Sequence, residues 1–156
     1  MNKNNLYIAG PLFNEAEKSF NRQLKKILSP YYEIYLPQED GGLMIDMIHS
    51  GIPPDIASNE VFNIDIQAIN KCDFLLLILD GRTIDEGAAF ELGYAYALGK
   101  KILGLRTDAR QLFIYGNNPM IENALDFSFS SIDELVEWSK SEVLHNKSFL
   151  NDTNEF

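Results

Sequence analysis

The chain has 156 residues, of which 13 are basic and 23 acidic, giving a formal charge of −10. This length suits one compact domain, and a composition of 46% hydrophobic and 23% charged residues excludes a disordered or fibrous chain. The negative charge would repel phosphate backbones and anionic lipids, so we expect neither nucleic acid nor a membrane as partner. With Cys72 as its single cysteine and no run of the ~20 apolar residues that span a bilayer, the chain is expected to be cytoplasmic.

The first half of the chain predicts two strands and a helix, followed by a long loop. An apolar run at 6–9 predicts a buried strand, helical spacing predicts a helix at 14–28, and a second strand is expected at 32–36. Glycines and prolines leave only a weak period at 37–54, which predicts a loop with one helical turn at 44–49.

The second half alternates helix and strand. Helical spacing returns at 55–70 and leads to six consecutive apolar residues at 74–79, which indicate a strand covered on both faces at the centre of a parallel sheet. The remaining elements continue the alternation and are predicted as a helix at 86–98, strands at 102–105 and 127–129, and a helix at 131–144.

This order predicts a single-domain, doubly wound α/β fold of the Rossmann or flavodoxin type, with about five mainly parallel strands flanked by helices. The domain is expected to span 1–145, and the polar residues 146–156 to form a tail or an arm that docks on a neighbouring subunit. Ligands of such sheets bind outside the carboxyl ends of the strands, in the loops that here begin at Gly10, Asp80 and Arg106.

Two carboxylates follow the central strand. Asp85 precedes the predicted helix and Glu91 lies about a turn and a half inside it, so both can face the strand ends. Gly87 and the small residues after it would let a ligand approach the first helical turn. A helix cap explains Asp85 equally well, and a solvated position would explain Glu91. The apolar neighbours of Glu91 favour a cleft instead.

Asp65 and Tyr7 are further candidates. Asp65 interrupts an apolar helix, although a surface position beside Asn63 explains it as well. Tyr7 lies within the first strand, where a core aromatic is the simplest interpretation, but its buried hydroxyl would need a partner. A carboxylate in the cleft would supply one.

Other chemistries lack their motifs. His49 and His145 have no cysteine or histidine at ligand spacing, so we predict no metal site. The loop at 10–13 has neither a dinucleotide fingerprint nor a phosphate-binding lysine, and no serine lies in a nucleophile elbow. We therefore expect no cofactor and consider carboxylates the reactive groups.

Four separated segments resemble the nucleoside 2-deoxyribosyltransferase family, and together they cover nearly the whole chain, from Tyr7 to about Leu125. They are Tyr7-Ile8-Ala9-Gly10-Pro11, Asn63-Ile64-Asp65, the segment DEGAAFELGYA at 85–95, and Asn118-Pro119-Met120. The segment at 85–95 is the most specific, and the four occur in the order of the family. The chain departs from the family pattern at Pro119, where many members carry leucine, and in its polar C-terminal end.

The resemblance implies an enzyme of nucleotide salvage that exchanges the nucleobase of 2'-deoxyribonucleosides for a free nucleobase, with retention of configuration. In that case Glu91 is the nucleophile that forms a covalent deoxyribosyl intermediate, and Tyr7 orients it. Asp85 and Asp65 would manage the nucleobase proton and the sugar hydroxyls.

The remaining implied residues bind substrate. Asn118 would contact the 5'-hydroxyl, in the site of a neighbouring subunit, because the family implies homo-oligomers, either dimers or hexamers. Gly10, Phe13, Gly87 and Met120 would complete the substrate pocket.

Two other interpretations stay open. A 2'-deoxynucleoside 5'-monophosphate N-glycosidase would share the sheet and the carboxylates, but it would need a phosphate pocket, and the apolar loop at 11–13 favours an uncharged nucleoside. A non-catalytic nucleotide sensor could use the same cleft, since the fold licenses no function by itself. The joint presence of Asp65, Asp85 and Glu91 favours an enzyme.

Overall fold

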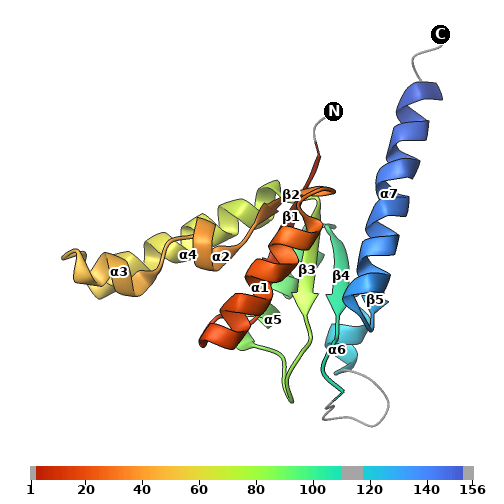
Figure 1. Ribbon diagram of the computed structural model, residues 1–156. Coiled ribbons are helices and arrows are strands. Elements are labelled where there is room, and N and C mark those ends of the chain that lie inside the picture. The colour runs from red at the N-terminus through yellow and green to blue at the C-terminus, as the bar shows by residue number, and fades with distance from the viewer. Residues whose placement is uncertain (1–2, 110–117, 153–156) are drawn as a thin grey trace.

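The computed structural model describes residues 3–109 and 118–152, with side chains described as far as His145. Twelve elements lie within those ranges (Figure 1). The strands are β1 Asn4–Ala9, β2 Tyr32–Tyr35, β3 Phe74–Ile78, β4 Lys101–Leu105 and β5 Phe127–Phe129. The helices are α1 Glu15–Leu28, α2 Pro37–Asp40, α3 Met44–His49, α4 Pro54–Lys71, α5 Glu86–Ala97, α6 Pro119–Glu122 and α7 Ile132–Asp152.

The five strands form one parallel sheet in the order β2-β1-β3-β4-β5. The predicted doubly wound α/β fold is therefore confirmed. Because the chain moves outward from β1 to β2 and then returns to build β3 on the other side, the order reverses between β1 and β3. That is the position where ligands of doubly wound sheets bind.

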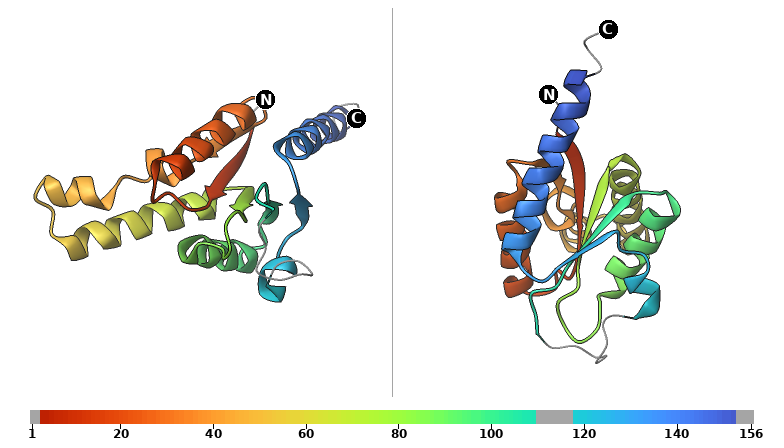
Figure 2. Two further views of the ribbon diagram at one scale, coloured as in Figure 1. Left: turned by 60° about the horizontal axis from the view of Figure 1, so that its bottom comes forward. Right: turned by 90° about the vertical axis from the view of Figure 1, so that its right-hand side faces the viewer.

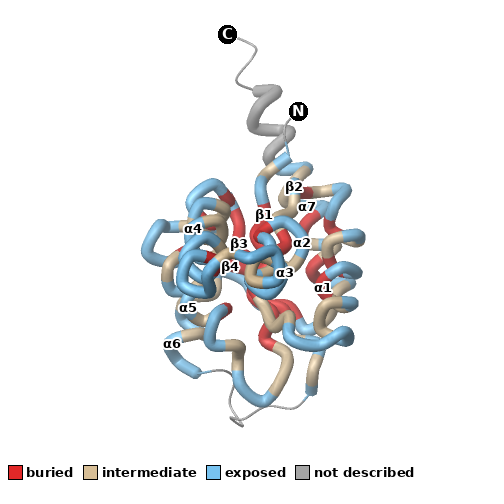
Figure 3. Tube along the Cα trace, turned by 90° about the vertical axis from the view of Figure 1, so that its left-hand side faces the viewer, coloured by how far each residue is buried: buried red, intermediate tan, exposed pale blue. Residues whose placement is uncertain are grey.

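Two helical layers cover the two faces of the sheet (Figure 2, left). Alternate strand residues point to opposite sides, so Leu6 and Ile8 pack with α1 and α7, whereas Tyr7 and Ala9 pack with α4 and α5. All five residues of β3 are buried, as the unbroken apolar run predicts, and the buried positions gather in the strands (Figure 3). The side chain of Tyr7 therefore packs between the sheet and the layer formed by α4 and α5.

Three details differ from the sequence prediction. The segment expected as a loop contains α2 in addition to the predicted turn, which is α3, and α6 was not expected. Both α2 and α6 have four residues and start at a proline, which suits the first turn of a helix but gives no periodicity to detect. The last helix continues past 144 to Asp152. Within the described residues no helix is long and apolar enough to cross a membrane.

Candidate active site

The centre of the candidate site is a hydrogen bond between Tyr7 and Glu91. Tyr7 comes from β1 and Glu91 from the second turn of α5, and the Tyr7 hydroxyl donates to Oε1 of Glu91 at 2.5 Å. Tyr7 is fully buried in the layer between the sheet and α5. The carboxylate partner expected for the Tyr7 hydroxyl is therefore Glu91. Its other oxygen, Oε2, accepts no hydrogen bond from the residues that the structure describes.

Burial raises the pKa of Glu91 to about 8. The hydrogen bond from Tyr7 opposes this rise, while the negative charges of Asp65 and Asp85 add to it. Asp65 and Asp85 therefore lie close enough to Glu91 for their charges to act on it. A carboxylate with so high a pKa, placed where ligands of this fold bind, has the character of a reactive group.

Asp65 is held from the other side by Tyr35, the last residue of β2. The Tyr35 hydroxyl donates to Oδ1 of Asp65 at 2.8 Å. Burial raises the pKa of Asp65, and this hydrogen bond opposes the rise. Tyr35 also stacks on Tyr7, with ring centroids 5.2 Å apart and an angle of 17° between the planes. Sequence reasoning missed Tyr35.

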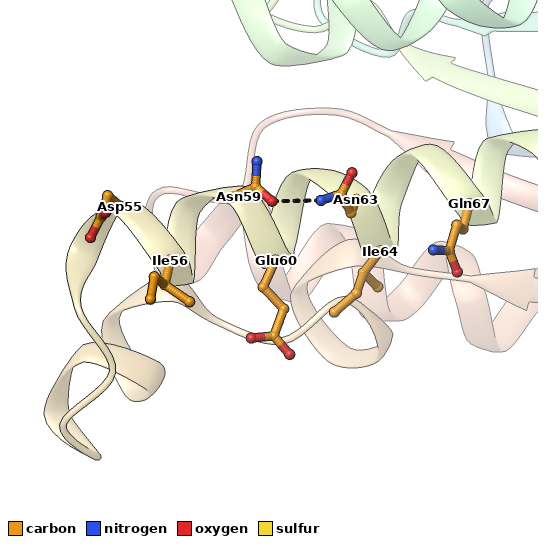
Figure 4. A pocket seen from close by; sticks show the side chains of 7 residues that line it. All are labelled: Asp55, Ile56, Asn59, Glu60, Asn63, Ile64 and Gln67. Atoms are coloured by element: carbon orange, nitrogen blue, oxygen red, sulfur yellow. Dashed lines mark hydrogen bonds between the residues drawn. The ribbon is translucent and has the colours of Figure 1, made fainter.

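Asp65 and Asn63 lie on different sides of α4. Asn63 donates from its side chain to Asn59 at 2.7 Å, and both line a hollow of about 590 Å³ with five other residues of α4 (Figure 4). Asp65 is absent from that lining and turns toward Tyr35. The surface interpretation therefore holds for Asn63 and not for Asp65.

Asp85 is the N-cap of α5, because its Oδ2 accepts a hydrogen bond from the backbone N–H of Ala88 at 2.8 Å. The helix-cap interpretation is thus confirmed. Since its charge also reaches Glu91, capping and a place in the site are compatible. Gly87 lies in the same turn, where a Cβ would come within 3.1 Å of Oδ2 of Asp85.

The loop after β1 carries Gly10 and Phe13. A Cβ on Gly10 would lie 2.8 Å from Cδ1 of Ile78, so the backbone passes directly over the end of β3. Phe13 is 75% exposed, and its backbone N–H donates a hydrogen bond to the side chain of Glu17. A role for either residue in substrate binding stays a prediction.

Asn118 and Met120 lie farther along, at α6. Asn118 caps that helix by accepting a hydrogen bond from the backbone N–H of Met120 at 2.9 Å, and the Met120 side chain is 81% exposed. Met120 lines an apolar hollow of about 550 Å³ between α6 and α5, together with Ala89, Gly93 and Tyr96. Among the described residues, no side-chain hydrogen bond joins Asn118 to Tyr7, Asp65 or Glu91.

The carboxyl end of β3 is covered by hydrogen bonds between the loops that follow β3 and β4. Asp80, which follows β3, accepts hydrogen bonds from the backbone N–H groups of Thr107 and Asp108 and from the Thr107 hydroxyl. Asp80 therefore fixes the loop after β4 against the loop after β3. In the part of the chain that is described, no three His, Cys, Asp or Glu side chains form a group that could hold a metal ion.

Fold and site together define a class of protein: a doubly wound α/β domain with partly buried, interacting carboxylates where its strand order reverses. The family can then be named. The model of the nucleoside 2-deoxyribosyltransferase family matches residues 6–147, so the chain belongs to that family, which is enzymatic. No curated protein sequence is significantly similar to the chain.

The chain is also similar to solved structures, among them the following three. A conserved protein from Enterococcus faecalis V583 shares 29% identity over 90% of this chain and 99% of its own, with a TM-score of 0.72. A 2-deoxyribosyltransferase from Bacillus psychrosaccharolyticus shares 21% identity over 89% of this chain and 95% of its own, with a TM-score of 0.70. The CMP N-glycosidase BcmB of Clostridium botulinum shares 17% over 85% and 96%, with a TM-score of 0.57. At these identities, the similarity of the chain to the last two structures is a similarity of fold.

Proposed function

We propose that this protein is a nucleoside 2-deoxyribosyltransferase that exchanges the nucleobase of 2'-deoxyribonucleosides. The observation that carries the proposal is the pair of Tyr7 and Glu91, in which a partly buried carboxylate has one oxygen held at 2.5 Å by a phenol. A nucleophile must be fixed in direction and weakly solvated, and this pair meets both needs. Membership of the family supports the same reaction.

In the first half of the proposed reaction, ionised Glu91 attacks the anomeric carbon of the deoxyribose. The new bond joins a carboxylate oxygen to that carbon while the bond from the carbon to the nucleobase nitrogen breaks. The electron pair of the broken bond stays on the nucleobase, which takes a proton from Asp85 acting as general acid. The negative surroundings of Glu91 stabilise the positive charge that develops on the sugar.

In the second half, a nitrogen of the incoming nucleobase attacks the same carbon and displaces Glu91. Asp85 takes the proton that this nitrogen loses, which restores the starting state. Two inversions at one carbon retain the configuration. In this scheme Asp65 accepts a hydrogen bond from a sugar hydroxyl, and Asn118 of a neighbouring subunit binds the 5'-hydroxyl.

The second candidate is a 2'-deoxynucleoside 5'-monophosphate N-glycosidase, in which water replaces the incoming base. Its support is the fold shared with the CMP N-glycosidase of C. botulinum. A phosphate dianion would however meet the negative charges of Asp65 and of ionised Glu91, and like charges repel strongly in a site of low dielectric. An uncharged nucleoside therefore suits the site better.

The test is chromatography of reactions that contain the purified protein. We expect deoxyadenosine to form from deoxyinosine when free adenine is present and not when it is left out. A parallel reaction with deoxyinosine monophosphate tests the hydrolase. Release of deoxyribose phosphate there, with no exchange product elsewhere, would replace the proposed function by the second candidate.

A pair of variants tests the role of Glu91. Glu91→Gln keeps the size of the side chain but removes the charge, and we expect it to bind deoxynucleoside and to lose turnover by at least about a thousandfold. Glu86→Gln is the matched control, because Glu86 is an exposed residue in the first turn of the same helix. A Glu91→Gln variant with unchanged exchange would refute the mechanism. A wild type that binds deoxynucleoside but shows no turnover would instead favour a binding function.

A further inference from the structure

Tyr35 makes two contacts that the proposed reaction does not yet use. Its hydroxyl donates to Oδ1 of Asp65, and its ring stacks on that of Tyr7. The two tyrosines are direct neighbours because β1 and β2 pair in parallel, with Tyr7 opposite Tyr35. The site therefore contains two matched pairs, each of one tyrosine and one carboxylate, joined through the stacked rings.

Within the described residues, each tyrosine binds one oxygen of its carboxylate and the second oxygen accepts no side-chain hydrogen bond. Tyr7 takes Oε1 of Glu91, and Tyr35 takes Oδ1 of Asp65. Both tyrosines stay protonated donors over the working pH range, because burial and the neighbouring carboxylates raise the pKa of each phenol far above its ordinary value. A donor that cannot ionise fixes the direction of the carboxylate that accepts from it.

The chain also closes tightly over the second pair at Gly41, the buried residue that ends α2. A Cβ at this position would lie 2.7 Å from Oδ1 of Asp65 and 2.8 Å from the Tyr35 hydroxyl oxygen. The backbone carbonyl of Pro37 would be 2.9 Å away, so the collision could not be relieved by a flexible side chain alone. The contact between Tyr35 and Asp65 is thus enclosed on the side of α2 by backbone.

We propose that Tyr35 is a positioning residue of the reaction, which holds Asp65 through its hydroxyl and supports Tyr7 through its ring. This inference rests on the proposed function for its kinetic consequence. The geometric part concerns Asp65 and Tyr35 alone and is measurable in an inactive protein. Tyr35 acts through Asp65 and through Tyr7, and within the described residues its hydroxyl makes no hydrogen bond to Glu91.

The first experiment compares Tyr35→Phe with Tyr32→Phe. Tyr35→Phe removes the hydroxyl and keeps the ring that stacks on Tyr7. Tyr32→Phe is the matched control on the same strand, because Tyr32 is a buried tyrosine on the opposite face of the sheet. We expect kcat/KM for base exchange to fall about tenfold in Tyr35→Phe, as for the loss of a hydrogen bond to a charged group, and to stay within about twofold in the control. Equal losses in both variants would overturn the proposal, since they would indicate a general structural effect.

A double-mutant cycle then asks whether Tyr35 acts through Asp65. If it does, adding Tyr35→Phe to an Asp65→Asn variant should lower kcat/KM by less than about threefold, because the charge that the hydroxyl holds is already gone. A second full tenfold loss would show that the two residues act independently. That outcome would refute the positioning role.

The last experiment needs no activity. The side-chain carboxyl of Asp65 is titrated by carbon-13 NMR in the wild type and in Tyr35→Phe. The groups that face Asp65 and its partner are Tyr7 on β1, Tyr35 on β2 and Glu91 on α5, with Asp40 of α2 beside Tyr35.

Because the hydrogen bond from Tyr35 lowers the pKa of Asp65, we expect that pKa to be higher by about one unit in Tyr35→Phe. An unchanged titration would refute the contact. If the wild type neither exchanges nor hydrolyses deoxynucleosides but the shift is present, the proposed function fails while the contact stands.

Discussion

At the scale of single residues, the unusual property of this chain is that burial raises the pKa of Glu91 from its ordinary acidic range to about 8. A glutamate with an ordinary pKa of 4.5 is ionised in the unfolded chain at pH 7, whereas burial raises its pKa to about 8 in the folded chain. The folded state therefore holds a proton that the unfolded state releases. Such a difference makes stability depend on pH in a predictable direction.

The first prediction is that Glu91→Gln stabilises the protein at alkaline pH. Below pH 4.5 both states hold the proton, so the wild type and the variant differ little. As the pH rises from 4.5 to about 8, the wild type loses stability because only its unfolded state ionises, and the loss is complete above about pH 8. Urea unfolding at pH 5 and pH 9 should show the free energy of unfolding of the variant exceeding that of the wild type at pH 9, by an amount on the order of a few kcal/mol. A difference that does not change with pH would contradict the raised pKa.

The second prediction concerns Tyr7→Phe. The hydrogen bond from Tyr7 lowers the pKa of Glu91, so its removal should raise that pKa above the wild-type value of about 8. If ionised Glu91 is the nucleophile, the acid limb of the pH profile of kcat/KM should lie near pH 8 in the wild type and move up by about one unit in the variant. A limb that stays in place would show that another group controls it.

Sequence reasoning located the carboxylates of the site better than it located their partners. Glu91 was placed in a cleft because an acid among apolar helix residues is rarely solvated, and the structure buries it beside Tyr7. Tyr35 was missed because an alternating strand shows which residues share a face but not which strand lies next to it. Once β1 and β2 are paired in register, Tyr35 is the residue beside Tyr7. The catalytic roles themselves stay predictions.

At the scale of elements, the start of α5 combines two functions in Asp85. The carboxylate caps the helix through the backbone N–H of Ala88, and its charge contributes to the raised pKa of Glu91. Two substitutions separate these functions, because asparagine caps a helix as well as aspartate does but carries no charge.

The third prediction follows. The free energy of unfolding of Asp85→Asn should be nearly that of the wild type. That of Asp85→Ala should be lower by about 1 kcal/mol, because alanine cannot cap the helix. Both variants should lose base exchange if Asp85 is the proton donor in the reaction. Thermal unfolding and the exchange assay on the same preparations check this. Retention of full activity in Asp85→Asn would leave Asp85 with a capping role alone.

The elements predicted from sequence were those with a long period or a long apolar run. The buried strand β3 has the apolar run and the helix α4 has the helical period, and each was predicted to within a residue at either end. The short helices α2 and α6 have neither, since four residues complete little more than one turn. The polar composition after residue 145 predicted a tail, yet the helical backbone continues to Asp152.

At the scale of the whole molecule, one side of the domain carries large apolar side chains that the chain itself leaves exposed. Ile56 and Phe62 on α4 are 54% and 51% exposed, and Phe90 and Tyr96 on α5 are 53% and 61% exposed. Phe62 and Phe90 lie next to each other, with ring centroids 5.9 Å apart. In Figure 1, α3 and the start of α4 also extend away from the sheet. Grouped exposure of this kind is typical of an interface between protein chains.

The fourth prediction is that a second copy of the chain covers this surface, in keeping with the homo-oligomer expected from sequence. Phe62→Ser should shift the mass measured by light scattering after size-exclusion chromatography from an oligomer toward a monomer, because a serine removes apolar area from the interface without disturbing the core. Leu144→Ser is the matched control, since Leu144 is an apolar residue of α7 that is 64% exposed and lies outside α4 and α5. If Asn118 completes the site of a neighbour, base exchange should fall together with the mass in Phe62→Ser and be unaffected in Leu144→Ser. A monomeric wild type with full activity would exclude both the interface and the shared site.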